Sequence, residues 1–279
     1  MKSTLSLLLL AAAAALTHAD ILVAELSGKV SQHRNEGTFV RNLATINSPH
    51  DVIVDNNGAV LIGSLDLGKA FKLTSLGQGP QYLFGDGTGR SQTGIVQDAN
   101  GFIYTSDFQR NRLYKWTPSG ALVATFGQNT PGADHIAIRG DILYVTAFFN
   151  NAVYAYRLSD LSLERAFEVQ LAGPTGICFD QNGWLYVCGY NNGRIRRFTP
   201  DFINGFDVAF NVASPHGMKI GPDGYLYVCE QGRGKILKIA PDGSSMTTHI
   251  SGLGLPTDVC FGTPRLREKP LPIGNSTIN

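Results

Sequence analysis

The chain has 279 residues, with 23 Lys and Arg against 22 Asp and Glu, so its formal net charge at pH 7 is only +1. Acidic and basic residues are interspersed along the chain, so no strong positive electrostatic potential is expected that would attract phosphates or anionic lipids. We therefore expect no nucleic-acid partner. The 32 Gly residues and the many aromatic residues indicate short strands and tight turns in one all-β domain.

Residues 1–19 are predicted to be a signal peptide. They combine a cationic start at Lys2, an apolar stretch from Leu5 to Leu16 and a small-residue exit that ends at Ala19. The apolar stretch is shorter than the roughly 18 residues that a membrane helix needs. We therefore expect a monomer, secreted or in the lumen of the secretory pathway, with no membrane attachment after cleavage.

A unit of about forty residues recurs along the rest of the chain. Each unit begins with a short apolar run, passes through a turn rich in Asp, Asn and Gly, and continues with a second run such as 185–187. A third run such as 194–198 and a fourth such as 123–126 complete it. Four strands in each unit predict the blade of a β-propeller. The second positions of the first strands are His50, Thr93, Asp134, Thr175, His216 and Thr257.

The two ends of the chain are expected to share the sixth blade. The last unit stops after one strand at Phe261, and the segments 21–25, near Lys29 and 38–43 supply the three missing strands. Residues 20–262 therefore form a six-bladed β-propeller of four-stranded blades, closed by pairing N-terminal strands with the C-terminal strand, which hides strand edges. Residues 263–279 are predicted to be a flexible tail, which carries the glycosylation sequon 275–277.

Four cysteines could form two disulfide bridges in an oxidising compartment. They are Cys178, Cys188, Cys229 and Cys260. Because they recur at equivalent strand positions where other units place small residues, we expect free, buried packing residues instead.

The repeats resemble those of NHL-repeat propellers and of the wider gluconolactonase-like, strictosidine synthase-like superfamily. The resemblance is carried by Pro174-Thr175-Gly176-Ile177 and Gly183-Trp184-Leu185-Tyr186-Val187 and covers nearly the whole mature chain. It implies the propeller fold, but the superfamily includes lactonases, lyases, cyclising enzymes and proteins that only bind.

Two particular families add expectations about the site. The segment 214–224 looks like the gluconolactonase stretch that carries a metal-binding Asn, with His216 in its place, and Glu25 could stand for that family's N-terminal carboxylate. This resemblance implies a divalent metal with Glu25, His216 and Glu230 as candidate ligands; the alternative is no cofactor, which we favour. The chain is also similar to streptogramin-type lyases in its Pro-His-Gly turns, although the blade of Thr257 separates His50 from His216.

Two rings of side chains are predicted at one mouth of the channel. The first contains the six second positions given above, and the second is approximately Glu25, Ser64, Asp107, Ala147, Gly189 and Glu230. Counting outward from the turn at 221–224 places His216 nearly opposite Glu230, which would make an acid/base pair. We expect His50, Asp107 and Asp134 to support this pair, with His135 nearby. The alternative is a polar channel lining that holds ordered water.

Aromatic side chains follow the second strands at the same mouth. Phe108, Phe148, Phe149 and Tyr190 are the predicted substrate-binding residues, together with Thr93, Thr175 and Thr257. Packing between blades is the alternative role for these rings.

The sequence therefore favours an enzyme that opens, closes or rearranges a ring in a small, aromatic or apolar organic molecule by acid/base or electrostatic catalysis. A cyclase or lyase of specialised metabolism and a metal-dependent lactonase are two versions. The rival hypothesis is a non-catalytic NHL-type module that binds a protein or a glycan.

Overall fold

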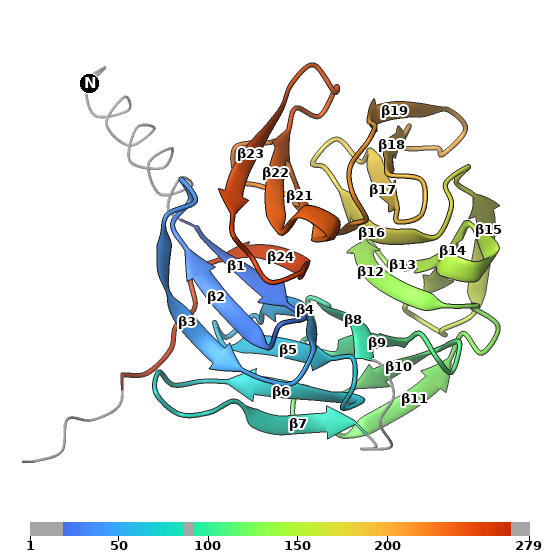
Figure 1. The fold of residues 1–279 in the computed structure, drawn as a ribbon. Coiled ribbons are helices and arrows are strands. Elements are labelled where there is room, and N and C mark those ends of the chain that lie inside the picture. The colour runs from blue at the N-terminus through green and yellow to red at the C-terminus, as the bar shows by residue number, and fades with distance from the viewer. Residues whose placement is uncertain (1–18, 86–91, 269–279) are drawn as a thin grey trace, which may run out of the picture.

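The computed structural model describes residues 19–85 and 92–268. Six four-stranded antiparallel sheets are arranged around a common centre (Figure 1), which confirms the predicted six-bladed β-propeller. The first three blades in chain order contain β4 (Pro49–Val54), β5 (Val60–Ser64), β6 (Lys69–Leu73), β7 (Gln81–Gly85), β8 (Gln92–Gln97), β9 (Ile103–Asp107), β10 (Arg112–Trp116), β11 (Leu122–Phe126), β12 (Ala133–Arg139), β13 (Ile142–Ala147), β14 (Ala152–Arg157) and β15 (Leu163–Glu168). The next two contain β16 (Pro174–Phe179), β17 (Leu185–Gly189), β18 (Arg194–Phe198), β19 (Gly205–Ala209), β20 (Pro215–Ile220), β21 (Leu226–Glu230), β22 (Lys235–Ile239) and β23 (Met246–Ser251).

The closing blade joins the two ends of the described chain. Its strands are β24 (Pro256–Gly262), β1 (Asp20–Glu25), β2 (Lys29–His33) and β3 (Phe39–Thr45). β24 pairs antiparallel with β1, with Ile21 opposite Phe261 and Val23 opposite Val259. The predicted closure is thus confirmed.

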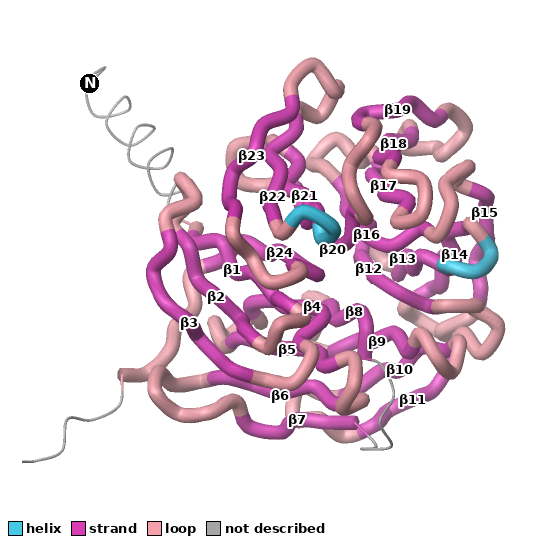
Figure 2. Tube along the Cα trace, viewed as in Figure 1, coloured by secondary structure: helices cyan, strands magenta, loops and turns pink. Residues whose placement is uncertain are grey.

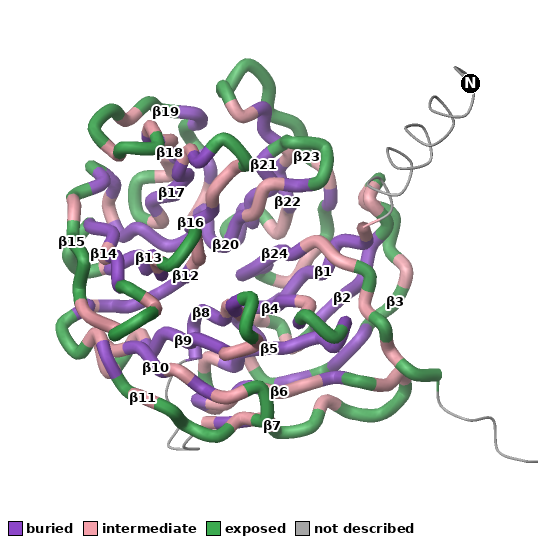
Figure 3. The backbone as a smooth tube through the Cα atoms, turned by 180° about the vertical axis from the view of Figure 1, so that it is seen from behind, coloured by how far each residue is buried: buried purple, intermediate pink, exposed green. Residues whose placement is uncertain are grey.

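The first strand of each repeat is the innermost strand of its blade. Loops and two short 3-10 turns, η1 (Phe148–Asn150) and η2 (Gln231–Arg233), connect the strands, and both turns directly follow second strands (Figure 2). The inner strands are almost wholly buried, while exposure increases toward the outermost strands (Figure 3). The functional groups on the inner strands therefore lie at the centre of the ring.

Hydrogen bonds within the repeat explain its recurring Asp and Tyr. Asp98 accepts backbone N–H bonds from Asn100 and Phe102 through Oδ1, both at 2.9 Å, which holds the hairpin turn. Its Oδ2 accepts the hydroxyl of Tyr104, a fully buried residue of the second strand, at 3.2 Å. This tie between turn and core recurs in the blade of Tyr227 and Asp223, where the distance is 3.0 Å.

The start of the predicted tail packs on a neighbouring blade. The backbone N–H of Arg265 donates to the Gly58 carbonyl at 2.7 Å, that of Arg267 donates to Thr74 at 3.0 Å, and Leu266 packs on a core cluster. The structure therefore differs from the expected flexible segment over its first residues, because backbone pairing and apolar contact hold them. Residues 269–279, with the sequon, and the signal peptide up to residue 18 lie outside the described residues.

The four cysteines are buried, and none is bonded to another within the described chain. Cys188 illustrates their role: its thiol donates to the His216 carbonyl at 2.9 Å, and burial raises its pKa to about 12. We expect all four thiols to resist alkylation in the native protein and to react once it is unfolded without reductant, as measured by mass spectrometry. Two intact bridges in the unfolded sample would contradict this prediction.

Within the described residues, no helix has the length and apolar character needed to cross a lipid bilayer.

Candidate functional site

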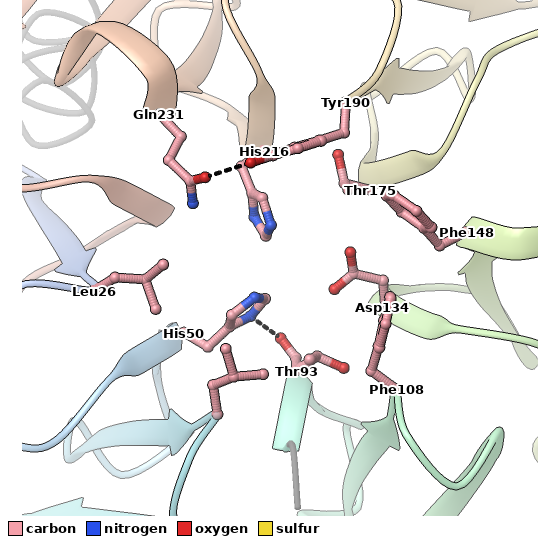
Figure 4. A pocket seen from close by; sticks show the side chains of 11 residues that line it. Leu26, His50, Thr93, Phe108, Asp134, Phe148, Thr175, Tyr190, His216 and Gln231 are labelled. Carbon is pink, nitrogen blue, oxygen red and sulfur yellow. Dashed lines mark hydrogen bonds between the residues drawn. The ribbon is translucent and has the colours of Figure 1, made fainter.

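A cavity of about 220 Å³ opens at the centre of the ring, at the mouth formed by the starts of the inner strands (Figure 4). Its floor comes from the second positions of five inner strands and its wall from loops on all six blades. The lining residues are His50, Thr93, Asp134, Thr175 and His216 on the floor, and Leu26, Leu65, Phe108, Phe148, Tyr190 and Gln231 on the wall.

A β-bulge places each floor residue. On β20, Pro215 is opposite Glu230 and the next pair joins Met218 to Val228, so two residues face one across the strand. The same shift occurs at the start of every inner strand. A bulge re-aims the extra residue, and here it directs the second position toward the centre.

Three threonines on alternate blades lock the floor together. The Thr93 hydroxyl donates to the Ala133 carbonyl and the Thr175 hydroxyl donates to the Pro215 carbonyl, both at 2.9 Å. Thr257 is fully buried and donates at 3.1 Å to Pro49. These predicted substrate-binding residues thus use their hydroxyls for bonds between blades, although Thr93 and Thr175 also line the cavity.

The other three blades contribute titratable side chains. His50 Nδ1 lies 2.8 Å from the Thr93 carbonyl, and His216 Nδ1 lies 3.0 Å from the Thr257 carbonyl. Each carbonyl fixes Nδ1 as the protonated nitrogen, so Nε2 is an acceptor. Neither Nε2 has a hydrogen-bond partner within the described chain, and both rings line the cavity, so these atoms are available to a ligand.

His135 completes a cluster of three imidazoles. Its ring centroid lies 5.4 Å from that of His50 and 4.9 Å from that of His216, while the His50 and His216 centroids are 4.8 Å apart. Asp134 and His135 are consecutive on β12, and the bulge there allows both to face the centre. His135 Nδ1 lies 3.3 Å from Asp134 Oδ1, and its Nε2 lies 3.9 Å from Asp258 Oδ1.

The three imidazoles differ in charge. Burial lowers the pKa of His216 to about 3, with a further contribution from His50, and burial also lowers the pKa of His50. Burial opposes ionisation of His135 too, but the Asp134 and Asp258 carboxylates outweigh it and raise its pKa to about 9. Burial tends to raise the pKa of Asp134, yet His135 holds it below the ordinary value. Two neutral rings therefore lie beside one ion pair.

A second buried charge cluster lies below the floor. The third positions of the inner strands are Asp51, Gly94, His135, Gly176, Gly217 and Asp258. Asp51 Oδ2 accepts the Ile95 N–H at 2.8 Å, and burial together with the Asp51 charge raises the pKa of Asp258. Burial works against the charge of Lys219, but Asp258 and Asp51 raise its pKa. A Cβ on Gly217 would overlap the Asp258 carboxylate, so the absence of a side chain at this position leaves the space that Asp258 occupies.

The wall ring is displaced by one residue from its predicted position. The second strands end at Glu25, Ser64, Asp107, Ala147, Gly189 and Glu230, but the following residue of each blade reaches the cavity. Successive side chains along a strand point to opposite sides. A shift of one residue therefore decides whether a side chain points into the cavity or into the space between blades. Leu26, Leu65 and Gln231 were missed for this reason.

The predicted carboxylates of the second ring bind loops instead of lining the cavity. Glu230 accepts the Ala213 N–H at 3.0 Å and pairs with Arg233, and its cross-strand neighbour is Pro215, not His216 as expected. Glu25 accepts the Gly254 N–H at 2.6 Å. Asp107 accepts the Arg110 N–H at 2.9 Å and the Tyr114 hydroxyl at 3.3 Å.

The aromatic predictions correspond closely to the wall. Phe108, Phe148 and Tyr190 line the cavity, and the Tyr190 hydroxyl donates to Gln231 Oε1 at 2.9 Å (Figure 4). Phe149 is 62% exposed and does not line the cavity; it packs on Phe108 with centroids 5.2 Å apart.

Among the described residues, the group whose potential ligand atoms lie close together differs from the metal ligands predicted from the sequence. Glu25 and Glu230 are engaged with backbone N–H groups on different blades. Potential ligand atoms of His50, Asp134 and His135 instead all lie within 4.8 Å of one another. The Pro-His-Gly resemblance indicated His216 but not His135, which stands where three other repeats place Gly.

Comparisons with known proteins show the fold. No family model matches the chain, and no curated protein matches it in sequence. A solved streptogramin B lyase is similar in structure, with a TM-score of 0.64 at 18% identity over 89% of this chain and 91% of that one. The nidogen propeller in a nidogen/laminin complex has a TM-score of 0.76 at 12% identity over 88% and 98% of the two chains.

A third similar structure is a catalytically inactive histidine-to-alanine variant of virginiamycin B lyase from Staphylococcus aureus, solved with quinupristin. Its TM-score is 0.64 at 16% identity over 89% of this chain and 94% of that one. Thus the same propeller architecture occurs in a lyase and in a protein solved in complex with another protein.

Proposed function

We propose that the chain is an enzyme that binds a small organic molecule at the mouth of the propeller and opens, closes or rearranges a ring by acid/base or electrostatic catalysis. One observation carries the proposal: a mainly apolar wall with three aromatic rings encloses a floor that contains His50, His216 and Asp134, and the ring of His135 packs against both of these histidines. Convergent titratable groups in an apolar cavity are typical of catalytic sites.

The cavity dimensions favour a single ring as the bound group. An apolar cavity of roughly 150 Å³ accepts benzene, so about 220 Å³ accepts one substituted ring. Phe108, Phe148 and Tyr190 offer faces and edges to an aromatic or apolar ring, and the Nε2 atoms of His50 and His216 can contact its polar substituents. The rest of a larger molecule would project outward.

The similarity to a lyase supports this proposal at the level of architecture. Titles of similar structures name streptogramin B and virginiamycin B lyases, one of them inactivated by loss of a histidine. On the basis of its repeats, we propose that the chain is related to the NHL-repeat and gluconolactonase-like group. On the basis of residues 1–19, we propose that it enters the secretory pathway. The rival hypothesis is a binding module. It is supported by the similarity to nidogen, whose propeller was solved in a complex with another protein.

We expect monocyclic aromatic compounds to bind in the cavity, and ligand-observed NMR with a fragment library can measure this. Phe148→Ala should weaken binding by about 10–100-fold, because burial of an aromatic side chain contributes about 1.5–3 kcal/mol. Phe206→Ala is the matched control, since Phe206 is exposed on β19 and packs on Trp184 away from the cavity. Bound fragments would then guide a search for turnover of ring-containing compounds by mass spectrometry.

If no fragment binds, or if both variants weaken binding equally, the small-molecule proposal fails. The binding-module hypothesis would then be the one to pursue.

A further inference from the structure

The cavity floor and the layer directly below it contain buried polar atoms that the rest of the described chain leaves unsatisfied. Asp134 Oδ1 and both ring nitrogens of His135 have no hydrogen-bond partner among the described residues. The 3.3 Å approach between Asp134 and His135 is an ion-pair distance, but the atoms are not aligned for a hydrogen bond. Buried polar atoms without partners are costly, and a bound ion is one way to satisfy them.

These atoms lie beside a third donor that is already oriented. The ligand atoms of His50, Asp134 and His135 are within 4.8 Å of one another, and all three residues are buried. The contact of His50 Nδ1 with the Thr93 carbonyl leaves Nε2 as the coordinating atom. Metal-binding histidines typically make such a contact to a backbone carbonyl through the other ring nitrogen.

We propose that His50, Asp134 and His135 bind one divalent first-row transition metal ion between the floor of the cavity and the layer below it, and that the ion takes the place of the proton on His135. Two imidazoles and one carboxylate suit Zn²⁺ and its neighbours, whereas Ca²⁺ and Mg²⁺ prefer oxygen ligands alone. Bonds to such an ion are about 2.0–2.2 Å long, so small side-chain rotations of Asp134 and His135 would draw the donors together. Three protein ligands leave a coordination position open toward the cavity.

The charges around the floor favour a cation there. Asp51 and Asp258 occupy the same layer as His135, and Asp258 Oδ1 lies 3.9 Å from His135 Nε2. Lys219 is the cationic side chain that balances this carboxyl pair, and it lines the opposite mouth of the channel. A divalent ion held by Asp134 and His135 would therefore lie near the Asp258 carboxyl group as well.

The catalytic meaning of this ion rests on the proposed function, but its binding can be tested without any substrate. The protein is stripped with a chelator, loaded with ZnCl₂, and measured by calorimetry and elemental analysis. We expect one Zn²⁺ per chain, and Co²⁺ loading should give visible absorption bands. His50→Ala, Asp134→Asn and His135→Ala should each weaken Zn²⁺ binding by at least about 100-fold, since even outer partners of ligands contribute 10–100-fold.

Glu25→Gln and Glu230→Gln are matched controls that remove buried carboxylates outside the proposed ligand set, and both should keep one Zn²⁺ per chain. Thermal unfolding of each variant checks the fold, and His135→Gln preserves side-chain volume if His135→Ala is unstable. The proposal is overturned if the wild type takes up no Zn²⁺ or if all three ligand variants retain it. Loss in His216→Ala combined with retention in Asp134→Asn would also overturn the ligand set.

The two proposals can fail separately. Fragment binding without Zn²⁺ uptake would sink the metal site alone, whereas Zn²⁺ uptake without any bound fragment would sink the proposed function alone.

Discussion

His216→Ala is expected to lower turnover of a substrate found for the cavity by about 10²–10⁴-fold, the usual effect of removing a general acid or base. The reason is geometric: His216 Nδ1 is held by the Thr257 carbonyl, and Nε2 is available to a ligand in the cavity. Initial-rate kinetics measure the effect. His216→Asn, which can keep a donor toward Thr257, separates the loss of the ring from a loss of folding.

Glu230→Gln is the informative control for this experiment. The amide oxygen can still accept the Ala213 N–H, so turnover should stay within a few-fold of the wild type. If Glu230→Gln and His216→Ala lowered turnover equally, the two side chains would act together as the sequence predicts, and a role of Glu230 in loop binding alone would be refuted.

The double variant His50→Ala/His216→Ala should turn over substrate little more slowly than either single variant, because the effects of residues that act as a unit are not additive.

Ending the chain after Gly254 is expected to unfold the protein under conditions where the full chain is stable. This truncation removes β24, which pairs with β1 and includes the fully buried Thr257 and Val259. Loss of a packed strand costs several kcal/mol out of a typical stability of about 5–15 kcal/mol. Thermal unfolding followed by circular dichroism is the measurement.

A chain that ends after Glu268 provides the comparison, and its midpoint should match the full protein, because all described contacts of the C-terminal segment are retained. Ending after Thr263 should have an intermediate effect, since it removes the backbone bonds of Arg265 and Arg267 and the packing of Leu266. Equal midpoints for chains that end after Gly254 and after Glu268 would refute a structural role for β24.

The fold could be predicted because its signals are local and repeated. A turn of the type 98–101 and a following strand with Tyr104 occur in related form along the chain, and each defines a hairpin without reference to distant residues. Closure followed from counting strands, since a one-stranded last unit needs the three N-terminal strands as partners.

The site was predicted only in part, because a bulge cannot be read from strand periodicity. Regular pairing would put His216 opposite Glu230, whereas the shift on β20 gives that place to Pro215 and directs His216 inward. Asp134 and His135 would point to opposite faces of a regular strand, yet both reach the centre. The repeat alignment does contain one usable signal: Asp51, His135 and Asp258 stand where three other units have Gly.

The order in which the chain is synthesised has a consequence for the cavity. The carbonyl that fixes His216 belongs to Thr257, and Asp258 Oδ1 lies 3.9 Å from His135 Nε2, so the floor depends on β24, the last of the propeller's strands to be synthesised. A nascent chain that has completed five blades still lacks this strand, and the edge of β1 has no partner. An incomplete translation product therefore carries an unfinished floor, and only chains that have been made through to the end of the propeller have a complete cavity.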